Sequence, residues 1–209
     1  MIERMQNVRL YLITDDLRSA GRRTEDVAAG AVRGGAGAVQ YRPWKVSDGD
    51  FLRTAVRLRA ITKEKSALLI INDRCDVALA ADADGVHLGA GDFPVETARK
   101  LLGPDKIIGF SAHSLEEARA AEADGADYLT LSPLFPTASA SRKREPLGIE
   151  RWLEIASRVS IPAFALGGVS LHNVHTLRAE GIQRVAAVSS LTEADDVALA
   201  ARLMAAALE

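Results

Sequence analysis

The sequence has 209 residues, of which 48% are hydrophobic and 26% charged, as in ordinary globular proteins of one large or two small domains. The net charge of −2 excludes the broad positive field with which proteins attract nucleic acid. No apolar segment approaches the length of a membrane span, the N-terminus lacks a signal-peptide pattern, and the single cysteine, Cys75, excludes an internal disulfide. These features predict a cytoplasmic protein that binds neither nucleic acid nor membrane.

Short apolar segments alternate with segments of helical periodicity along the chain. The predicted strands are 10–14, 38–41, 67–71, 86–88, 107–111, 128–131, 163–166 and 184–188. The predicted helices are 24–33, 47 to about 61, 76–81, 95–102, 114–123, 149–159, 171–180 and 192–208. Thr24, Ser47, Ser114 and Thr192 are the expected caps of their helices.

This alternation and the length predict a single (β/α)8 TIM barrel domain over residues 1–209. The strands are short and unalternating, as strands covered on both faces should be. An internal echo supports a repeat, because ADG occurs at 83–85 and 123–125 and AEG at 179–181, where each glycine is expected to end a helix before a strand. An open doubly wound sheet is the weaker alternative, since the first strand lacks a following GxGxxG motif.

A long polar loop follows the sixth predicted strand. Ser132-Pro133 and Phe135-Pro136 direct the chain out of the sheet, and residues 138–144 are small or basic without a hydrophobic period. Long loops of this kind inside a compact domain are more often functional than not. The hydroxyls of Thr137, Ser139 and Ser141 beside the basic run 142–144 favour an anionic ligand, whereas the alternative is a solvated loop without a role.

Polar residues gather where the predicted strands end, which is where TIM barrels carry their active sites. They are Asp15, Asp16, Gln40, Arg42, Asn72, Asp73, His87, Asp92, Ser111, His113, Ser132 and Thr137. Small residues after strands seven and eight, Gly167-Gly168 and Ser189-Ser190, suit a phosphate site. Asp73 and Asp92 are hard oxygen ligands that suit Mg²⁺ beside a phosphate.

Each of these residues also has a structural explanation. Asn72-Asp73 could serve only to cap the next helix, and His87 alone is more often a core residue than a catalyst. His172 and His175 are expected on the surface. Cys75 has no flanking base and is expected to be structural.

Several segments together carry a resemblance to a known family. They are LYLITDD (10–16), VQYR (39–42), INDRCDVALAADADGVHLG (71–89), GFSAHSLEEA (109–118), ADYLTLSPLFPT (126–137), PLGIE (146–150), IPAFALGGV (161–169) and VAAVSSL (185–191). From residue 10 to 191 the chain resembles the thiamin phosphate synthases and the related thiazole tautomerases. Synthases of this family join a pyrimidine diphosphate to a thiazole phosphate and release pyrophosphate. The resemblance therefore implies phosphate and diphosphate substrates.

The resemblance implies one set of residues at the diphosphate. Gln40, Arg42 and Asn72 would contact it, and Asp73 and Asp92 would hold Mg²⁺. Metal and cationic donors stabilise a leaving group rich in negative charge, whose departure leaves a pyrimidinylmethyl cation.

A second set is implied on the thiazole side. Ser111 would contact the pyrimidine or the departing diphosphate, and Thr137, with the hydroxyl of Ser139 kept nearby, would face the thiazole phosphate. That phosphate would be cradled by Gly168, Val188 and Ser189. The expected catalytic residues are Arg42, Ser111 and His113.

Three segments depart from the usual synthase pattern. Arg-x-Lys is replaced by Arg42-Pro43-Trp44-Lys45, and Thr-x-Thr-Lys by Thr137-Ala138-Ser139-Ala140. The usual Gln-Glu before the second aspartate is Ala90-Gly91. Two lysines expected at the diphosphate are therefore missing or displaced, and Lys45, Arg142 and Lys143 are candidates to replace them.

Three functions follow from this pattern. The first is a magnesium-dependent synthase, which the retained Asp73 and Asp92 favour. The second is a thiazole tautomerase with His113 as the acid–base group, since imidazole titrates near neutral pH. The third is a catalytically silent binder of thiazole or thiamin phosphates; loss of the lysines favours the second and third. The sequence leaves open whether the chain forms a homo-oligomer.

Overall fold

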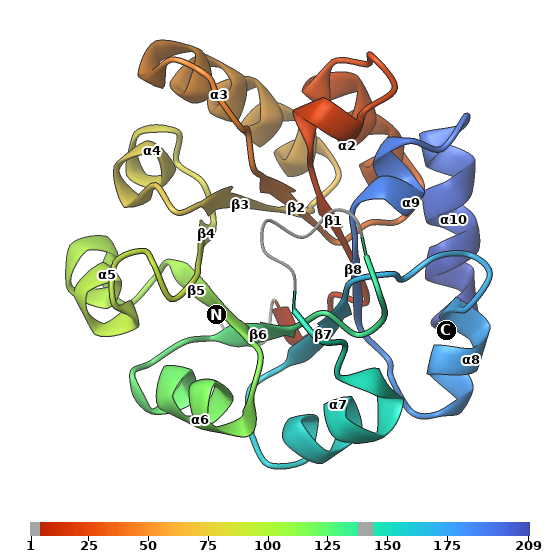
Figure 1. Ribbon diagram of the computed structural model, residues 1–209. Helices are drawn as coiled ribbons and strands as arrows, with labels where there is room; N and C mark the ends of the chain where they lie inside the picture. The colour runs from red at the N-terminus through yellow and green to blue at the C-terminus, as the bar shows by residue number, and fades with distance from the viewer. Residues whose placement is uncertain (1–4, 138–143) are drawn as a thin grey trace.

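Eight parallel strands close into a barrel in the computed structural model, which describes residues 5–137 and 144–209 (Figure 1). The strands are Leu10–Ile13 (β1), Ala38–Tyr41 (β2), Leu68–Asn72 (β3), Gly85–Leu88 (β4), Ile107–Ala112 (β5), Tyr128–Leu131 (β6), Ala163–Leu166 (β7) and Val185–Ala187 (β8). Each pairs with the next, and β8 pairs with β1 through Leu10 and Val185. The predicted TIM barrel is confirmed, and the open doubly wound sheet is wrong.

Helices surround the strands as an outer layer (Figure 1). Their bounds are Asp16–Arg18 (η1), Thr24–Arg33 (α2), Asp48–Glu64 (α3), Cys75–Ala80 (α4), Val95–Leu102 (α5), Leu115–Ala123 (α6), Gly148–Ala156 (α7), Val174–Ala179 (α8), Ser189–Thr192 (α9) and Val197–Ala207 (α10). Within the described ranges, no helix has the length and apolar character needed to cross a membrane.

Two of the four predicted caps are confirmed. Thr24 is not a cap, because it is the first residue of α2, whose N-cap is Arg23 and which has no side-chain cap. Ser47 accepts a hydrogen bond from the backbone N–H of Asp50, and Ser114 from that of Glu117. Thr192 is not a cap, because it is the buried last residue of the short helix α9. The last helix is capped instead by Asp196, whose carboxylate accepts from the N–H of Leu199 at 3.0 Å. The sequence pattern did not reveal that a separate helical turn follows β8 directly.

Apolar side chains form two layers on either side of the strands. The inner layer fills the barrel and includes Tyr11, Ile70, Tyr128 and Phe164. The outer layer joins strands to helices. Gly109 makes room for the interior, because a Cβ on this residue would lie 2.1 Å from the ring of Tyr128. Tyr128 can therefore extend across the inside of the barrel.

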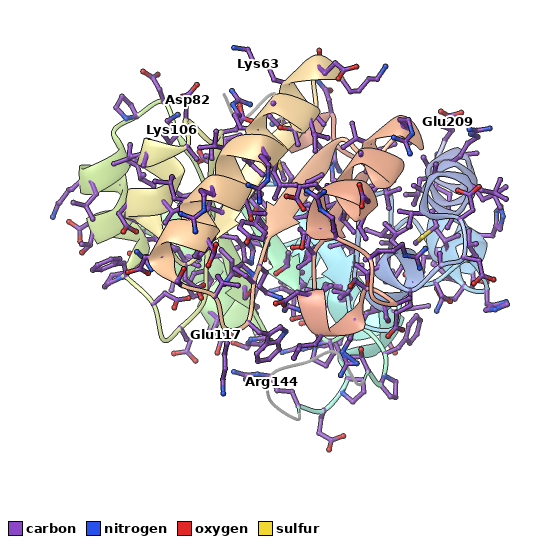
Figure 2. The ribbon with its side chains drawn as sticks, turned by 90° about the horizontal axis from the view of Figure 1, so that it is seen from above. Lys63, Asp82, Lys106, Glu117, Arg144 and Glu209 are labelled. Atoms are coloured by element: carbon purple, nitrogen blue, oxygen red, sulfur yellow. The ribbon has the colours of Figure 1, made fainter. Side chains whose placement is uncertain are left out.

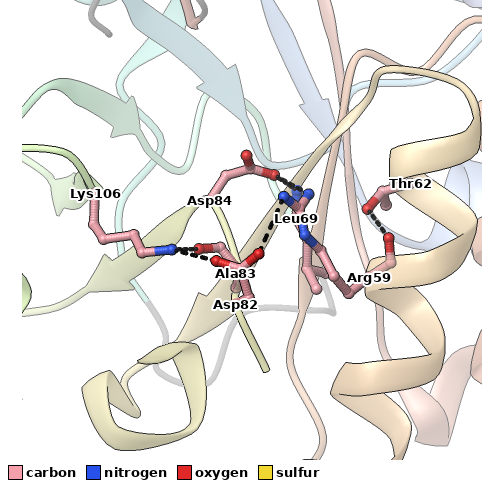
Figure 3. A network of polar contacts seen from close by, with 7 residues as sticks. All are labelled: Arg59, Thr62, Leu69, Asp82, Ala83, Asp84 and Lys106. Carbon is pink, nitrogen blue, oxygen red and sulfur yellow. Dashed lines mark hydrogen bonds and ion pairs between the residues drawn. The ribbon is translucent and has the colours of Figure 1, made fainter. Parts of the chain in front are cut away.

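The sequence echo is confirmed at two of its three places, because Gly125 and Gly181 follow the ends of α6 and α8, each with a φ of 95°. Gly85 does not end a helix, since it is the first residue of β4. A second repeated feature is an aspartate just before a strand. Asp84 accepts from the N–H of Leu69 and from Arg59, at 2.9 and 2.8 Å (Figure 3). A second, partly buried clamp of the same design precedes β6.

In this second clamp Asp127 accepts from the N–H of Ile108 and from Arg99, at 2.7 and 2.6 Å. Both aspartates lie where strands begin. Figure 2 shows Lys63, Asp82 and Lys106 toward this end of the molecule, and Glu117 and Arg144 toward the opposite end. The polar strand ends therefore gather at the end that Arg144 marks.

Candidate active site

A cavity of about 490 Å³ opens at the carboxyl ends of the strands. Its lining residues include Arg42, Trp44, Asn72, Asp73, His87, Asp92, Ser111, His113, Ser132, Thr137, Arg144, Gly167 and Val188. The fold thus brings together most of the residues that the sequence indicated. Gln40, Gly168 and Ser189 are not part of this lining, and Ser139, Arg142 and Lys143 lie outside the described residues.

Two carboxyl groups meet on one wall of the cavity. The side chains of Asp73 and Asp92 are within hydrogen-bonding distance of each other. Desolvation and the neighbouring Asp92 raise the pKa of Asp73 to about 7, although Arg42 acts in the opposite direction. Two carboxylates this close cannot both be charged at low cost, so they share a proton or require a cation.

The backbone holds both aspartates in place. Asp73 has a φ of 61° and donates its N–H to the carbonyl of His87 at 2.9 Å. Asp92 accepts from the N–H of Gly89 at 2.7 Å. The following helix has Arg74 at its N-cap and no side-chain cap, so the capping explanation for Asn72-Asp73 is wrong. Among the described residues there is no group of three or more His, Cys, Asp or Glu side chains that could hold a metal.

Arg42 lies beside this pair, held by a buried carboxylate. Asp15 is 1% exposed; it pairs with the guanidinium of Arg42 at 3.4 Å and accepts from the indole N–H of Trp44 at 3.1 Å. Desolvation lowers the pKa of Arg42, and within the described part of the chain its buried Nε has no acceptor. An anion in the cavity would supply that acceptor.

Trp44 stands near the position where synthases usually carry a lysine, and it forms part of the cavity wall. Lys45, one residue later, is exposed and is not part of the lining. Arg144 does line the cavity. Arg144 was expected only as the last residue of the basic run 142–144, because the sequence does not show where its side chain lies.

His87 joins the interior of the barrel to the cavity. Its Nε2 lies 2.9 Å from Ser111 Oγ, and its Nδ1 lies 3.0 Å from the hydroxyl of Tyr128. Burial lowers the pKa of His87 to about 3, so the imidazole is neutral near pH 7. Gln40 also lies inside the barrel, 1% exposed, where its amide donates to Tyr11.

His113 follows β5 and also lines the cavity. Its Nδ1 is 2.6 Å from the carbonyl oxygen of Ser132. Since a carbonyl only accepts, Nδ1 carries a proton, and in the neutral form of the ring the lone pair is on Nε2. Glu117 fixes the segment by accepting from the backbone N–H of His113 at 2.7 Å.

The glycine pair after β7 is explained by close backbone packing. Gly167 and Gly168 have φ values of 99° and 68°, which favour glycine. A Cβ on Gly167 would lie 2.8 Å from Pro133, and one on Gly168 would lie 2.7 Å from Phe135. The segment after β6 is therefore held against β7, which positions Thr137 at the cavity. Phosphate binding by Gly168 and Ser189 stays a prediction.

The remaining sequence expectations concern residues away from the cavity. Cys75 is buried, and desolvation raises the pKa of its thiol, as a structural cysteine requires. His172 and His175 are exposed, as expected.

Comparisons with known proteins agree with this geometry. The family model described as thiamine monophosphate synthase matches residues 10–191. Thiamine-phosphate synthase of Clostridium novyi (strain NT) is 40% identical over 199 residues, which cover 95% of this chain and 98% of that protein. The enzyme of the same name from Chloroflexus aurantiacus is 44% identical over 198 residues, covering 95% of this chain and 91% of that protein.

A solved structure gives the same result in three dimensions. Thiamine phosphate pyrophosphorylase from Pyrococcus furiosus superposes with a TM-score of 0.88 at 36% identity, covering 96% of this chain and 95% of that one. The family model matches well over half of the chain, and the relatives are matched over nearly their whole length. This chain belongs to the thiamine monophosphate synthase family.

Proposed function

We propose that this protein is a thiamin phosphate synthase, which joins a hydroxymethylpyrimidine diphosphate to a thiazole phosphate in thiamin biosynthesis and releases pyrophosphate. The observation that carries the proposal is the paired carboxyls of Asp73 and Asp92 beside the guanidinium of Arg42. A diphosphate with its counter-cation matches both the acidic and the basic part of this wall. Family membership agrees with the same activity.

Mg²⁺ fits the donor set at this wall. Asp73 and Asp92 offer hard carboxylate oxygens that already compete for one proton, and Asn72 adds an amide in the same lining. Mg²⁺ commonly binds through one or two carboxylates and completes its shell with water and phosphate oxygens. Bound there, the ion would neutralise charge that grows on the departing diphosphate.

The chemistry divides among the residues that line the cavity. The bond from the pyrimidine methylene carbon to the diphosphate oxygen breaks, and its electron pair leaves with the diphosphate. Arg42 and Ser111, which both line the cavity, would donate hydrogen bonds to that leaving group. The thiazole nitrogen then forms the new carbon–nitrogen bond with its lone pair, a step that depends on positioning. Leu88 and Val188, which also line the cavity, would limit access of water to the pyrimidinylmethyl cation that the departing diphosphate leaves.

Arg144 supplies the positive charge that the displaced lysine would otherwise provide. It is the cation from the long β6 loop that lies within the described residues, and it lines the cavity. Thr137 lines the cavity from the same loop. A guanidinium can contact phosphate oxygens with two parallel hydrogen bonds, which suits a diphosphate.

One observation favours a second candidate, a thiazole tautomerase. The Nδ1 of His113 lies 2.6 Å from the carbonyl oxygen of Ser132, so the lone pair of the neutral ring would be on Nε2, as a proton acceptor requires. A tautomerase, however, gives no role to the carboxyl pair, and the synthase is therefore the better explanation of the whole cavity.

The purified protein, given both substrates and Mg²⁺, tests the proposal. We expect thiamin phosphate and pyrophosphate to form together. Proton exchange on the thiazole phosphate without these products would support the tautomerase. Binding of thiazole or thiamin phosphate with neither reaction would support the silent binder.

A further inference from the structure

A chain of polar side chains runs through the inside of the barrel and ends at the cavity. The amide nitrogen of Gln40 donates to the hydroxyl of Tyr11 at 2.8 Å, and this hydroxyl is 2.8 Å from that of Tyr128. The hydroxyl of Tyr128 is 3.0 Å from His87 Nδ1. On the other side of the ring, His87 Nε2 is 2.9 Å from Ser111 Oγ. The chemistry described above uses only the last member.

Burial forces these groups to satisfy one another. Tyr11 and Tyr128 are 0% exposed, Gln40 is 1% and His87 is 4% exposed. The two tyrosine rings pack edge to face with each other and with Phe164 at centroid distances of 5.5–5.8 Å, which fixes their hydroxyls. Buried polar groups that lack a partner are costly, so the protons in this chain have to follow one consistent direction.

That direction follows from its first member. The amide nitrogen of Gln40 can only donate, so the hydroxyl of Tyr11 accepts from it and gives its own proton to Tyr128. Tyr128 then donates to Nδ1 of His87. The neutral imidazole therefore carries its proton on Nε2 and donates to Ser111 Oγ.

The last link faces the cavity. Because Ser111 Oγ accepts from His87, its own proton is left for another acceptor. Among the described residues, Thr130 Oγ1 can accept it at the longer distance of 3.3 Å, and Thr130 Oγ1 also lies 3.3 Å from His87 Nε2. Ser111 also lines the cavity, where an anionic oxygen would be a stronger acceptor than a neutral hydroxyl.

We propose that Gln40, Tyr11 and Tyr128 are positioning residues that hold His87 as the Nε2–H tautomer and thereby direct the Ser111 proton toward an anionic oxygen in the cavity. The identity of that oxygen, the diphosphate of the pyrimidine substrate, rests on the proposed function. The role of Gln40 is then exerted from inside the barrel, four hydrogen bonds away from Ser111.

The tautomer can be read directly by NMR. Two-bond ¹H–¹⁵N correlation spectra of protein with ¹⁵N-labelled histidine distinguish the two ring nitrogens, and a His87→Asn variant assigns its signals among the four histidines. We expect wild-type His87 to carry its proton on Nε2. Tyr128→Phe removes the hydroxyl that donates to Nδ1 of His87, and we expect the Nδ1–H tautomer of His87 to become populated in this variant. A wild-type spectrum with the proton on Nδ1 would overturn the proposal.

The consequence for the ligand is measured with pyrophosphate and Mg²⁺ by calorimetry. We expect Tyr128→Phe to weaken pyrophosphate binding about tenfold, as loss of one well-aimed donor to a charged group would do. In a Ser111→Ala background, Tyr128→Phe should have no further effect, because the chain acts only through Ser111. Tyr41→Phe is the matched control, since Tyr41 is 3% exposed and is not a member of the hydrogen-bonded series from Gln40 to Ser111.

The outcomes separate this proposal from the proposed function. If wild-type protein fails to make thiamin phosphate, the proposed synthase activity is contradicted. The tautomer of His87 and the affinity for pyrophosphate still test the positioning role of Gln40, Tyr11 and Tyr128. Weaker pyrophosphate binding in Tyr128→Phe with an unchanged His87 tautomer would show a merely structural effect and would overturn the proposal. An equal loss in Tyr41→Phe would do the same.

Discussion

Asp73 and Asp92 follow neighbouring strands, β3 and β4, and their carboxyl groups are within hydrogen-bonding distance of each other. Each is fixed through the backbone of β4 or the turn after it: Asp73 donates to the carbonyl of His87, and Asp92 accepts from the N–H of Gly89. The pair is thus held before any cation arrives. This arrangement suits a site that exchanges a proton for a metal ion.

Replacing either aspartate should abolish magnesium binding in the presence of pyrophosphate. Asn keeps the size of the side chain but loses the charge that Mg²⁺ requires. Calorimetry on Asp73→Asn and Asp92→Asn is expected to show at least a tenfold loss of affinity, on the order of 1.4 kcal/mol. Asp76→Asn serves as the control, because Asp76 lies on α4, pairs with Arg74 and is not part of the cavity lining. Wild-type affinity in both cavity variants would contradict the assignment.

Magnesium affinity should depend on pH. Desolvation and Asp92 raise the pKa of Asp73 to about 7, so below that value a proton occupies the pair and competes with the metal. We expect the dissociation constant to increase about tenfold for each pH unit below 7 and to level off above it. Calorimetric titrations with magnesium from about pH 5 to pH 8 measure this affinity. Repeating them in buffers of different ionisation enthalpy gives the number of protons released when the metal binds. A constant affinity from about pH 5 to pH 8 would show that Asp73 is not a ligand.

The same carboxyl should destabilise the metal-free protein at high pH. Its folded-state pKa lies above the usual Asp value, so the folded protein holds more protons than the unfolded chain between about pH 4 and pH 7. The contribution of Asp73 to the free energy of unfolding therefore falls as pH rises through this window. Solvent screening reduces the size of the effect, because Asp73 is an exposed residue.

Asp73→Asn tests this sign. Asn tolerates the φ of 61° and carries no charge, so the variant is expected to melt a few degrees higher than wild type near pH 8 without metal. Near pH 4 the two melting temperatures should converge. A lower melting temperature for the variant at both pH values would mean that the carboxylate stabilises the metal-free fold.

Many features of this fold could be predicted from short segments of the sequence. Ser47 and Ser114 cap their helices as predicted, because their side chains act on a backbone N–H three residues away. The polar strand ends also converge as predicted, since parallel strands in a barrel end on one side. Thr192 and Gly85 were misassigned because several arrangements of a short helix and a strand satisfy the same local pattern.

The direction of particular side chains could not be predicted. Gln40 is the third residue of β2, and its amide lies inside the barrel, where it donates to the hydroxyl of Tyr11. Trp44 was seen only as a residue in the place of a lysine, and its bond to Asp15 depends on two separate loops. Such contacts join residues that are far apart in the sequence, and the hydrophobic periodicity of a local segment does not predict them.

Arg144 should be the cation that compensates for the displaced lysine. Charge-assisted hydrogen bonds contribute about 1.5–3 kcal/mol, so Arg144→Ala is expected to lower kcat/KM for the pyrimidine diphosphate by roughly 10- to 150-fold. Lys45→Ala should remain close to wild type, because Lys45 is not part of the cavity lining. Arg158→Ala, which removes an exposed guanidinium after α7, is the matched control. A larger loss in Lys45→Ala than in Arg144→Ala would reverse the assignment.

The central claim is that the cavity catalyses condensation of the two substrates with loss of pyrophosphate. The most direct measurement is a single-turnover reaction of purified protein with hydroxymethylpyrimidine diphosphate, thiazole phosphate and Mg²⁺, in which thiamin phosphate and pyrophosphate are quantified from the same sample. We expect the two products to appear at equal rates and in equal amounts, and neither to form when thiazole phosphate is omitted or when Asp73 is replaced by Asn. Absence of thiamin phosphate in the complete mixture, with both substrates recovered intact, would contradict the synthase.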